Sequence, residues 1–153
     1  MKTKHFILTL CLFCASIGTG FAQNKVFDKY ADMDNVTSVF ISKAMFRMMS
    51  NINNVGVNLM NLKGKMESLQ LVTSENKDRI TQMKREFPQI LSSHHQELMR
   101  VKDGKTRVSF YSDLKDDKIK ELIMLVDDEK NYTAIMITGN FTLQDIQDFA
   151  EQN

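Results

Sequence analysis

The sequence predicts an α+β domain, in which a mostly antiparallel sheet of about five strands carries helices packed on one face. Several short runs are rich in β-branched and aromatic residues, and other stretches repeat apolar residues at helical spacing. Towards the C-terminus, two nearly continuous apolar runs are joined by a short charged loop, which is typical of an antiparallel hairpin near the centre of a sheet. The element order is compatible with a ferredoxin-like arrangement in part, and the length of 153 residues suits one domain.

The N-terminus has the composition of a cleavable signal peptide. Two lysines precede an apolar run from Phe6 to Ala15 that is too short to span a bilayer. Gly20 and Ala22 place small residues at the −3 and −1 positions of a cut before Gln23. We therefore expect a signal peptide at residues 1–22 and an exported chain, in the periplasm or outside the cell, with association to the outer membrane left open.

Both cysteines of the sequence lie in this leader. Leu10 precedes Cys11 and Phe13 precedes Cys14, whereas a lipidated cysteine needs a small residue directly before it, so a lipoprotein is not expected. With 20 Lys plus Arg against 19 Asp plus Glu, the charge is close to neutral, which argues against nucleic-acid binding. No second long apolar segment follows the leader, so no transmembrane segment is expected in the mature chain.

The mature chain is expected to begin with a polar segment at residues 23–35, followed by a single α+β domain at residues 36–153. Val26, Phe27 and Tyr30 give the polar segment one short apolar face that could dock on the domain. Because the rest of the segment is polar, we expect it to be only partly ordered.

The first strand is predicted at Val36 to Ser42, a stretch rich in β-branched and aromatic residues. It runs directly into a helix in which Met45 and Met49 recur at helical spacing and are therefore expected in the core. An Asn-rich loop and a short second helix that ends near Gly64 are expected next.

A second strand, MESLQLVTS, precedes a long helix. Ser74 or Asn76 can cap its N-terminus, and apolar residues continue at helical spacing as far as Val101. Pro88 removes one backbone donor, so we expect a kink or two helices at this point. Gly104 is expected to close the helix in a left-handed conformation.

The remainder is predicted to be mostly sheet. The stretch TRVSFYS alternates like a strand, and the runs IKELIMLVD and YTAIMITG form the expected hairpin. Thr142 starts a closing helix, with Asp145 as its partner in a capping box.

Three stretches carry a resemblance to a known family: FDKYADMDNVTSVFISKAMFRMM, ELMRVKDG and KIKELIMLVDDEKNYTAIMITGNFTLQDIQ. In these stretches, and over almost all of the mature chain, the sequence resembles the exported Gram-negative bacterial proteins grouped as domain of unknown function 4252. The resemblance implies an envelope protein. It implies no activity, ligand or catalytic residue, because the shared pattern consists of structural residues.

The stretch SSHHQE is the best candidate for metal binding. On the predicted helix, His94 and Glu97 lie one turn apart and share a face, and His95 stands beside them. The remaining histidine, His5, is in the leader, so the ligand set is incomplete and a solvated or half-buried helix face is the competing interpretation. We expect no catalytic residue and no cofactor, because no serine stands in a nucleophile-elbow context.

Met48 lies off the predicted apolar stripe of its helix, so it and the neighbouring Phe46 are the candidate interface residues. The leading hypothesis is an exported non-enzymatic interaction module whose partner is an envelope protein or a cell-surface component. A binder of a small hydrophobic ligand or lipid is the first alternative, since helices over a sheet can enclose an apolar pocket. A metal-dependent enzyme that uses His94 and His95 is the second.

Overall fold

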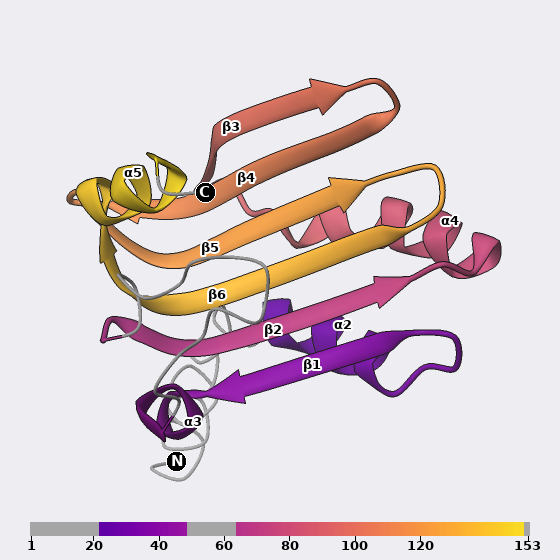
Figure 1. The fold of residues 1–153 in the computed structure, drawn as a ribbon, viewed down its shortest axis with the longest axis horizontal. Coiled ribbons are helices and arrows are strands. Elements are labelled where there is room, and N and C mark those ends of the chain that lie inside the picture. The colour runs from indigo at the N-terminus through magenta and orange to yellow at the C-terminus, as the bar shows by residue number, and fades with distance from the viewer. Residues whose placement is uncertain (1–21, 49–63, 152–153) are drawn as a thin grey trace, which may run out of the picture.

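The computed structural model describes residues 22–48 and 64–151, which form one six-stranded antiparallel sheet with flanking helices. The strand order is β1-β2-β6-β5-β4-β3, so the last strand of the chain lies in the middle of the sheet (Figure 1). The elements are α2 (Ala22–Ala31), β1 (Thr37–Ser42), α3 (Lys43–Met48), β2 (Met66–Ser74), α4 (Lys77–Glu86), the 3-10 helix η3 (Phe87–Ile90), β3 (His95–Asp103), β4 (Thr106–Lys115), β5 (Lys118–Asp127), β6 (Tyr132–Thr142) and α5 (Leu143–Glu151).

The predicted α+β class and the antiparallel pairing are confirmed, but the sheet has six strands and not about five. Strands β3 to β6 form a meander, and all five strand pairs are antiparallel. The partly ferredoxin-like arrangement is not found. Its split βαβ units have one strand between the two that a helix connects, whereas three strands, β6, β5 and β4, lie between β2 and β3, which α4 and η3 connect. The loop and short helix predicted before Gly64, together with Met49, lie outside the described residues.

The additional strand, β3, forms in a stretch where the sequence predicts a helix. Helix α4 ends at Glu86, the 3-10 helix η3 carries Pro88 in its first turn, and the chain then enters β3 at His95. The missing N–H of Pro88 ends the α-helical ladder, and antiparallel pairing with β4 gives the following residues their hydrogen bonds. Gly104, with φ of 58°, forms the turn between β3 and β4 and does not end a helix.

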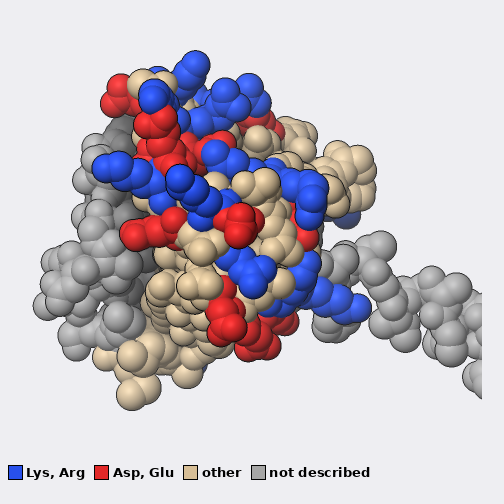
Figure 2. Space-filling model, turned by 90° about the vertical axis from the view of Figure 1, so that its right-hand side faces the viewer, with Lys and Arg blue, Asp and Glu red and all other residues tan. Residues whose placement is uncertain are grey.

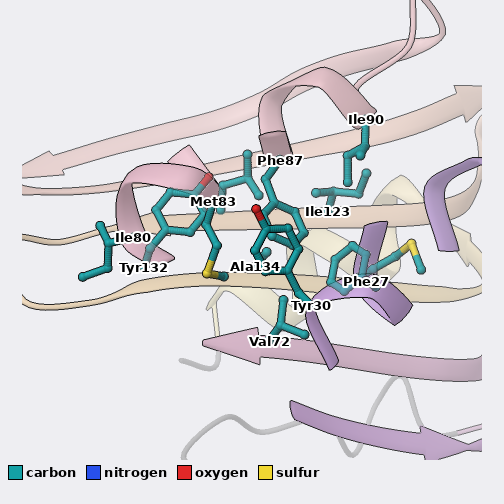
Figure 3. Close-up of a cluster of buried hydrophobic side chains, with 12 residues drawn as sticks. Phe27, Tyr30, Val72, Ile80, Met83, Phe87, Ile90, Ile123, Tyr132 and Ala134 are labelled. Carbon is teal, nitrogen blue, oxygen red and sulfur yellow. The ribbon is translucent and has the colours of Figure 1, made fainter. Parts of the chain in front are cut away.

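One face of the sheet is covered by α2, α4 and η3. Phe87 lies at the centre of this layer, with its ring 5.1 Å from the rings of both Phe27 and Tyr30 and 6.2 Å from that of Tyr132 (Figure 3). Met83 of α4 is fully buried in the same cluster. These aromatic contacts join the N-terminal helix, the 3-10 helix and the central strand into one core.

The segment at residues 23–35 is more ordered than its composition predicts. Most of it is the helix α2, whose Phe27 and Tyr30 are 1% and 0% exposed. The predicted docking face is therefore part of the main core. A mostly polar sequence can form such a helix, because two aromatic side chains on one face bury enough apolar area to hold it against the sheet.

A second cluster lies on the opposite face, at one end of the sheet. Successive side chains of a strand point to opposite faces, and Leu122 belongs to this cluster whereas Ile123 belongs to the first. Phe46 of α3 and Ile146 of α5 pack here (Figure 1 shows both helices at the same end of the sheet). Helices therefore lie on both faces, and not on one as predicted.

The predicted helix caps are confirmed. The side chain of Asn76 accepts hydrogen bonds from the backbone N–H groups of Asp78 and Arg79 at the start of α4. Thr142 and Asp145 form a reciprocal capping box, in which each backbone N–H donates to the other side chain, at 2.8 and 3.3 Å. None of the helices in the described part of the chain is long and apolar enough to cross a bilayer.

Candidate functional site

His95, one of the predicted metal ligands, has both ring nitrogens engaged within the protein. Its side chain is only 2% exposed. The backbone N–H of Ser92 donates to Nδ1 at 3.0 Å, so Nδ1 is an acceptor and the ring proton is on Nε2. Nε2 then donates to Oε1 of Glu121 at 2.9 Å. His95 therefore ties the start of β3 to β5 across the intervening strand β4.

The other two metal candidates do not converge on His95. His94 lies in a turn and Glu97 lies in β3, so the two residues do not share the helical face that the sequence predicts. His94 is exposed in the turn before β3, and the carboxylate of Glu97 accepts from the Arg100 guanidinium. Within residues 22–48 and 64–151, no group of three or more His, Cys, Asp or Glu side chains is arranged to hold a metal ion.

The buried tyrosines are also poorly suited to acid–base chemistry. Burial raises the pKa of both Tyr30 and Tyr132, and the nearby carboxylates of Glu86 and Asp127 raise it further. A general base or acid works best when its pKa lies near neutral pH. Both phenols are shifted away from neutrality, so they act as neutral core residues.

The two candidate interface residues of α3 have opposite environments. Phe46 is fully buried in the second cluster, whereas Met48 is 77% exposed. Met45, which its spacing places in the core, is 48% exposed, so that prediction is wrong. The helix has only six residues and starts directly after β1, and this entry turns Phe46 towards the sheet in place of Met45.

We call residues 37–48, which form β1 and α3, the β1–α3 surface. Val39 and Phe40 are 43% and 64% exposed, and with Met45 and Met48 they make up four of the seven large apolar side chains that are exposed in the described part of the chain. Strand β1 lies at one edge of the sheet and contains no charged residue. Sequence reasoning identified Met48 but missed β1, because edge position is a property of the sheet order.

The opposite edge of the sheet has a different composition. Strand β3 carries four charged residues, and its exposed apolar side chains are Met99 and Val101, at 43% and 45%. Charged side chains on an edge strand oppose the addition of a further strand. The uncharged β1 lacks this protection.

Two hollows adjoin β1. A mostly apolar groove of about 260 Å³ runs between α2 and β1, with Phe27, Val39 and Phe40 among its lining residues. A larger and mostly polar hollow of about 510 Å³ lies at the other end of the strand, beside Asn35, and contains the single carboxylate of Glu75. Neither hollow has a histidine among its described lining residues, so neither pairs a nucleophile with a histidine there.

Charged side chains form no single-sign surface on the face that Figure 2 shows. Basic and acidic side chains are interspersed there. Opposite charges also pair within the described part of the chain, since Lys84 lies 2.6 Å from Asp127 and Lys29 lies 2.7 Å from Glu86. A nucleic-acid-binding face normally concentrates basic residues, so this face has no such footprint.

The described residues thus define an α+β protein with one antiparallel sheet, an uncharged edge strand and an exposed apolar surface beside it. A family model described as a domain of unknown function (DUF4252) matches residues 30–149, and the chain belongs to this family. Neither the curated proteins nor the solved structures contain a significant match to the chain.

Proposed function

We propose that this protein is an exported module of the cell envelope that binds another protein chain on its β1–α3 surface and catalyses no reaction. The proposal is carried by one observation: exposed apolar side chains are concentrated on an uncharged edge strand and on the helix that follows it. Exposed apolar groups that lie together mark interaction sites, whereas the same groups scattered singly do not.

The composition of the β1–α3 surface supports a protein partner. Aromatic residues, methionine and arginine are enriched in protein interfaces, and this surface presents Phe40, Met45, Arg47 and Met48. Methionine side chains are flexible and polarisable, so they adapt to the shape of a partner. Among the described residues, the outer side of β1 has no strand partner, and its backbone groups offer hydrogen bonds that a lipid or a surface glycan satisfies less completely than a peptide does.

Export is the part of the proposal that rests on the sequence. The basic start, the short apolar run and the small residues before Gln23 support a cleaved leader. The absence of cysteine from residues 15–153 is consistent with an oxidising compartment, where a free thiol is a liability. Mass spectrometry of the protein purified from its host tests this directly, because cleavage predicts a chain that begins at Gln23.

A second candidate function is binding of a small hydrophobic ligand, which the apolar groove between α2 and β1 favours. The groove's volume of about 260 Å³ is below the range of about 300–1,000 Å³ that is usual for ligand pockets. It suits the side chain of a bound protein better than a lipid. A lipid that co-purifies with the wild type and is lost from Phe40→Ser would reverse this preference.

Site-specific crosslinking tests the proposal. A photoreactive amino acid is placed at position 40, 48 or 99 in separate full-length chains, which are expressed in the source cell and irradiated. We expect positions 40 and 48 to crosslink to the same protein chain and position 99, on the opposite edge, to give no crosslink.

The affinity of the captured partner gives a second test. The double variant Phe40→Ser, Met48→Ser should weaken binding about tenfold or more, whereas Met99→Ser should not, because residues at the centre of an interface dominate its affinity. Equal capture at position 99, or turnover of a substrate by the purified protein, contradicts the proposal.

A further inference from the structure

We infer that the chain bound at the β1–α3 surface is a second copy of this protein, whose own β1 pairs antiparallel with the first across a two-fold axis. The two six-stranded sheets then form one continuous sheet. This inference rests on the proposed function and names its partner.

The backbone of β1 provides the first argument. Its described pairing is with β2 on one side, along the register Thr37↔Thr73 to Ser42↔Ser68. The outer side of an edge strand presents a row of N–H and C=O groups, and another strand is the partner that satisfies all of them. Such a partner meets no charged side chain on β1, in contrast to the charged strand β3 at the other edge.

The side chains of β1 suit pairing with themselves. A two-fold axis perpendicular to the sheet keeps like faces together. An antiparallel β1 pair centred on Phe40 therefore places Phe40 beside Phe40 on one face and Val39 beside Ile41 on the other. Val39 and Ile41 lie on the face of the second cluster, because they pair with Leu71 and Leu69. Phe40, on the α2 face, lies beside the apolar groove that a partner's Phe40 side chain can enter. Cross-strand pairs of aromatic and β-branched residues of this kind stabilise a sheet.

The charges on either side of β1 select the antiparallel arrangement. Asp32 and Asp34 are exposed just before the strand, and Lys43 and Arg47 are exposed just after it. A strand that pairs antiparallel with its own copy places the acidic end of each protomer beside the basic end of the other. A parallel pair would oppose acidic to acidic and basic to basic ends, which is unfavourable.

This arrangement of charges is the observation that favours a second copy over another partner. The neutral stretch of residues 35–42 is flanked by acids on one side and bases on the other, so the segment is complementary to itself in one orientation. An unrelated peptide requires only an uncharged edge and exposed apolar groups, and it gives no reason for opposite charges to be placed symmetrically about the strand. The β3 edge mixes both signs within the strand and has no such pattern.

Complementary charge reversal tests the inference on the full-length protein. One variant carries Lys43→Glu and Arg47→Glu, and the other carries Asp32→Lys and Asp34→Lys. We expect wild type to be a dimer in native mass spectrometry and sedimentation at micromolar concentration. Each variant alone should show a dimer dissociation constant raised about tenfold or more, because like charges then meet at both ends. An equal mixture of the two should form heterodimers with an affinity near that of wild type.

Controls separate folding from association. Recovery of the heterodimer shows that both variants are folded, and circular dichroism of each alone confirms it. The control variant Arg100→Glu, Lys102→Glu, on the β3 edge, should leave the dimer unchanged. Val39→Asp should abolish it, because one buried carboxylate from each copy would then lie in the new strand pair.

Three outcomes overturn the inference, and they bear differently on the proposed function. A monomeric wild type whose position 40 crosslinks to a different protein overturns the second copy and leaves the binding surface intact. A monomer without any crosslink overturns both. A dimer that persists in both charge-reversal variants and in Val39→Asp must form through another surface, and this result overturns the inference. If position 40 still crosslinks to a different protein in that case, the proposed function stands.

Discussion

His95 shows how one buried side chain can resemble a metal ligand in sequence and yet serve the fold. Its two ring nitrogens contact the turn at Ser92 and the Glu121 carboxylate of β5. In many metal sites, a hydrogen bond to a carboxylate orients the histidine ligand. In this protein, the same kind of pair joins β3 to β5, which are not neighbours in the sheet. The residue type alone does not distinguish these uses, since the sequence separates His95 from Glu121 by a hairpin.

We predict that His95→Ala destabilises the protein by roughly 1–3 kcal/mol, because hydrogen bonds to Ser92 and Glu121 are lost in a buried position. His94→Ala, in the exposed turn, is the matched control and should change stability by less than about 0.5 kcal/mol. Urea unfolding of both variants measures the difference. Equal losses would contradict the structural role, and bound zinc lost from His95→Ala would favour the metal hypothesis.

Gly139 is a second position where one atom matters. A Cβ added there would lie 2.3 Å from the backbone oxygen of Lys65, which accepts a hydrogen bond from the N–H of Asn140. Gly139→Ala should therefore cost about 1–3 kcal/mol in unfolding free energy, as overpacking does elsewhere. Gly64→Ala, where a Cβ would meet nothing within 4 Å, should be close to neutral in the same thermal melts. Similar melting temperatures for the two variants would refute the close approach.

At the scale of elements, the helix α2 is held by both apolar and ionic contacts. Its two aromatic residues enter the core, and Lys29 donates to Glu86 at the end of α4 at 2.7 Å. The hydrogen bond from Lys29 lowers the pKa of Glu86 below its ordinary value, although partial burial opposes this. Lys65 lowers the pKa of Asp145 in the same way at the start of α5. Both terminal helices are thus fastened by a carboxylate that is easier to ionise when the protein is folded.

This linkage predicts a loss of stability in acid. A carboxyl whose pKa is lower in the folded state stabilises the fold above its unfolded pKa, which is about 4.3 for Glu, and the contribution disappears as the pH falls through the folded value. Melting temperatures between about pH 6 and pH 3 should therefore decline less steeply for Glu86→Gln than for wild type. The exposed Glu75→Gln is the control and should keep the wild-type slope. If Glu86→Gln declines as steeply as wild type, the ion pair contributes no pH dependence.

Most elements of this fold follow from local patterns. The strands β5 and β6 are continuous apolar runs because both faces are covered over much of their length, and the cap residues Asn76 and Thr142 mark their helices. Strand β3 cannot be predicted from local patterns. Ile90, Leu91 and Leu98 have helical spacing in the sequence, whereas the strand forms because it pairs with β4. The β1–α3 surface also combines a feature that local sequence predicts with one that it does not. Met48 was found from its place off the apolar stripe, whereas the edge position of β1 depends on contacts distant in sequence.

The whole molecule has two unlike edges and a core that depends on its N-terminal helix. The charged edge at β3 is protected, and the uncharged edge at β1 is adjacent to exposed methionines. Between them, the aromatic cluster joins residues near the start of the described chain to the central strand β6 (Figure 3). A domain that began only at residue 36 would lack Phe27 and Tyr30.

We predict that a chain starting at residue 36 does not fold cooperatively, whereas one starting at residue 23 does. Loss of a single buried aromatic side chain costs about 3–5 kcal/mol, and total stability is typically about 5–15 kcal/mol, so the loss of two removes most of it. Thermal melts followed by circular dichroism compare the two chains. Phe27→Ala in the longer chain gives an intermediate test that keeps the helix. A sharp, unchanged transition for the shorter chain would show that α2 is dispensable.

The central place of β6 governs the timing of folding during synthesis. This strand is the last of the described strands, yet it lies between β2 and β5, and its pairing with β2 joins residues from Ser74 and Tyr132 to Met66 and Gly139, which are far apart in sequence. The pair of β1 and β2 therefore lacks the partner strand of β2 until nearly the whole chain has left the ribosome. Contacts of such long range slow folding and leave strand edges open to aggregation while they form. The sheet order thus gives the growing chain an interval in which the inner side of β2 has no strand partner and can pair with the wrong strand.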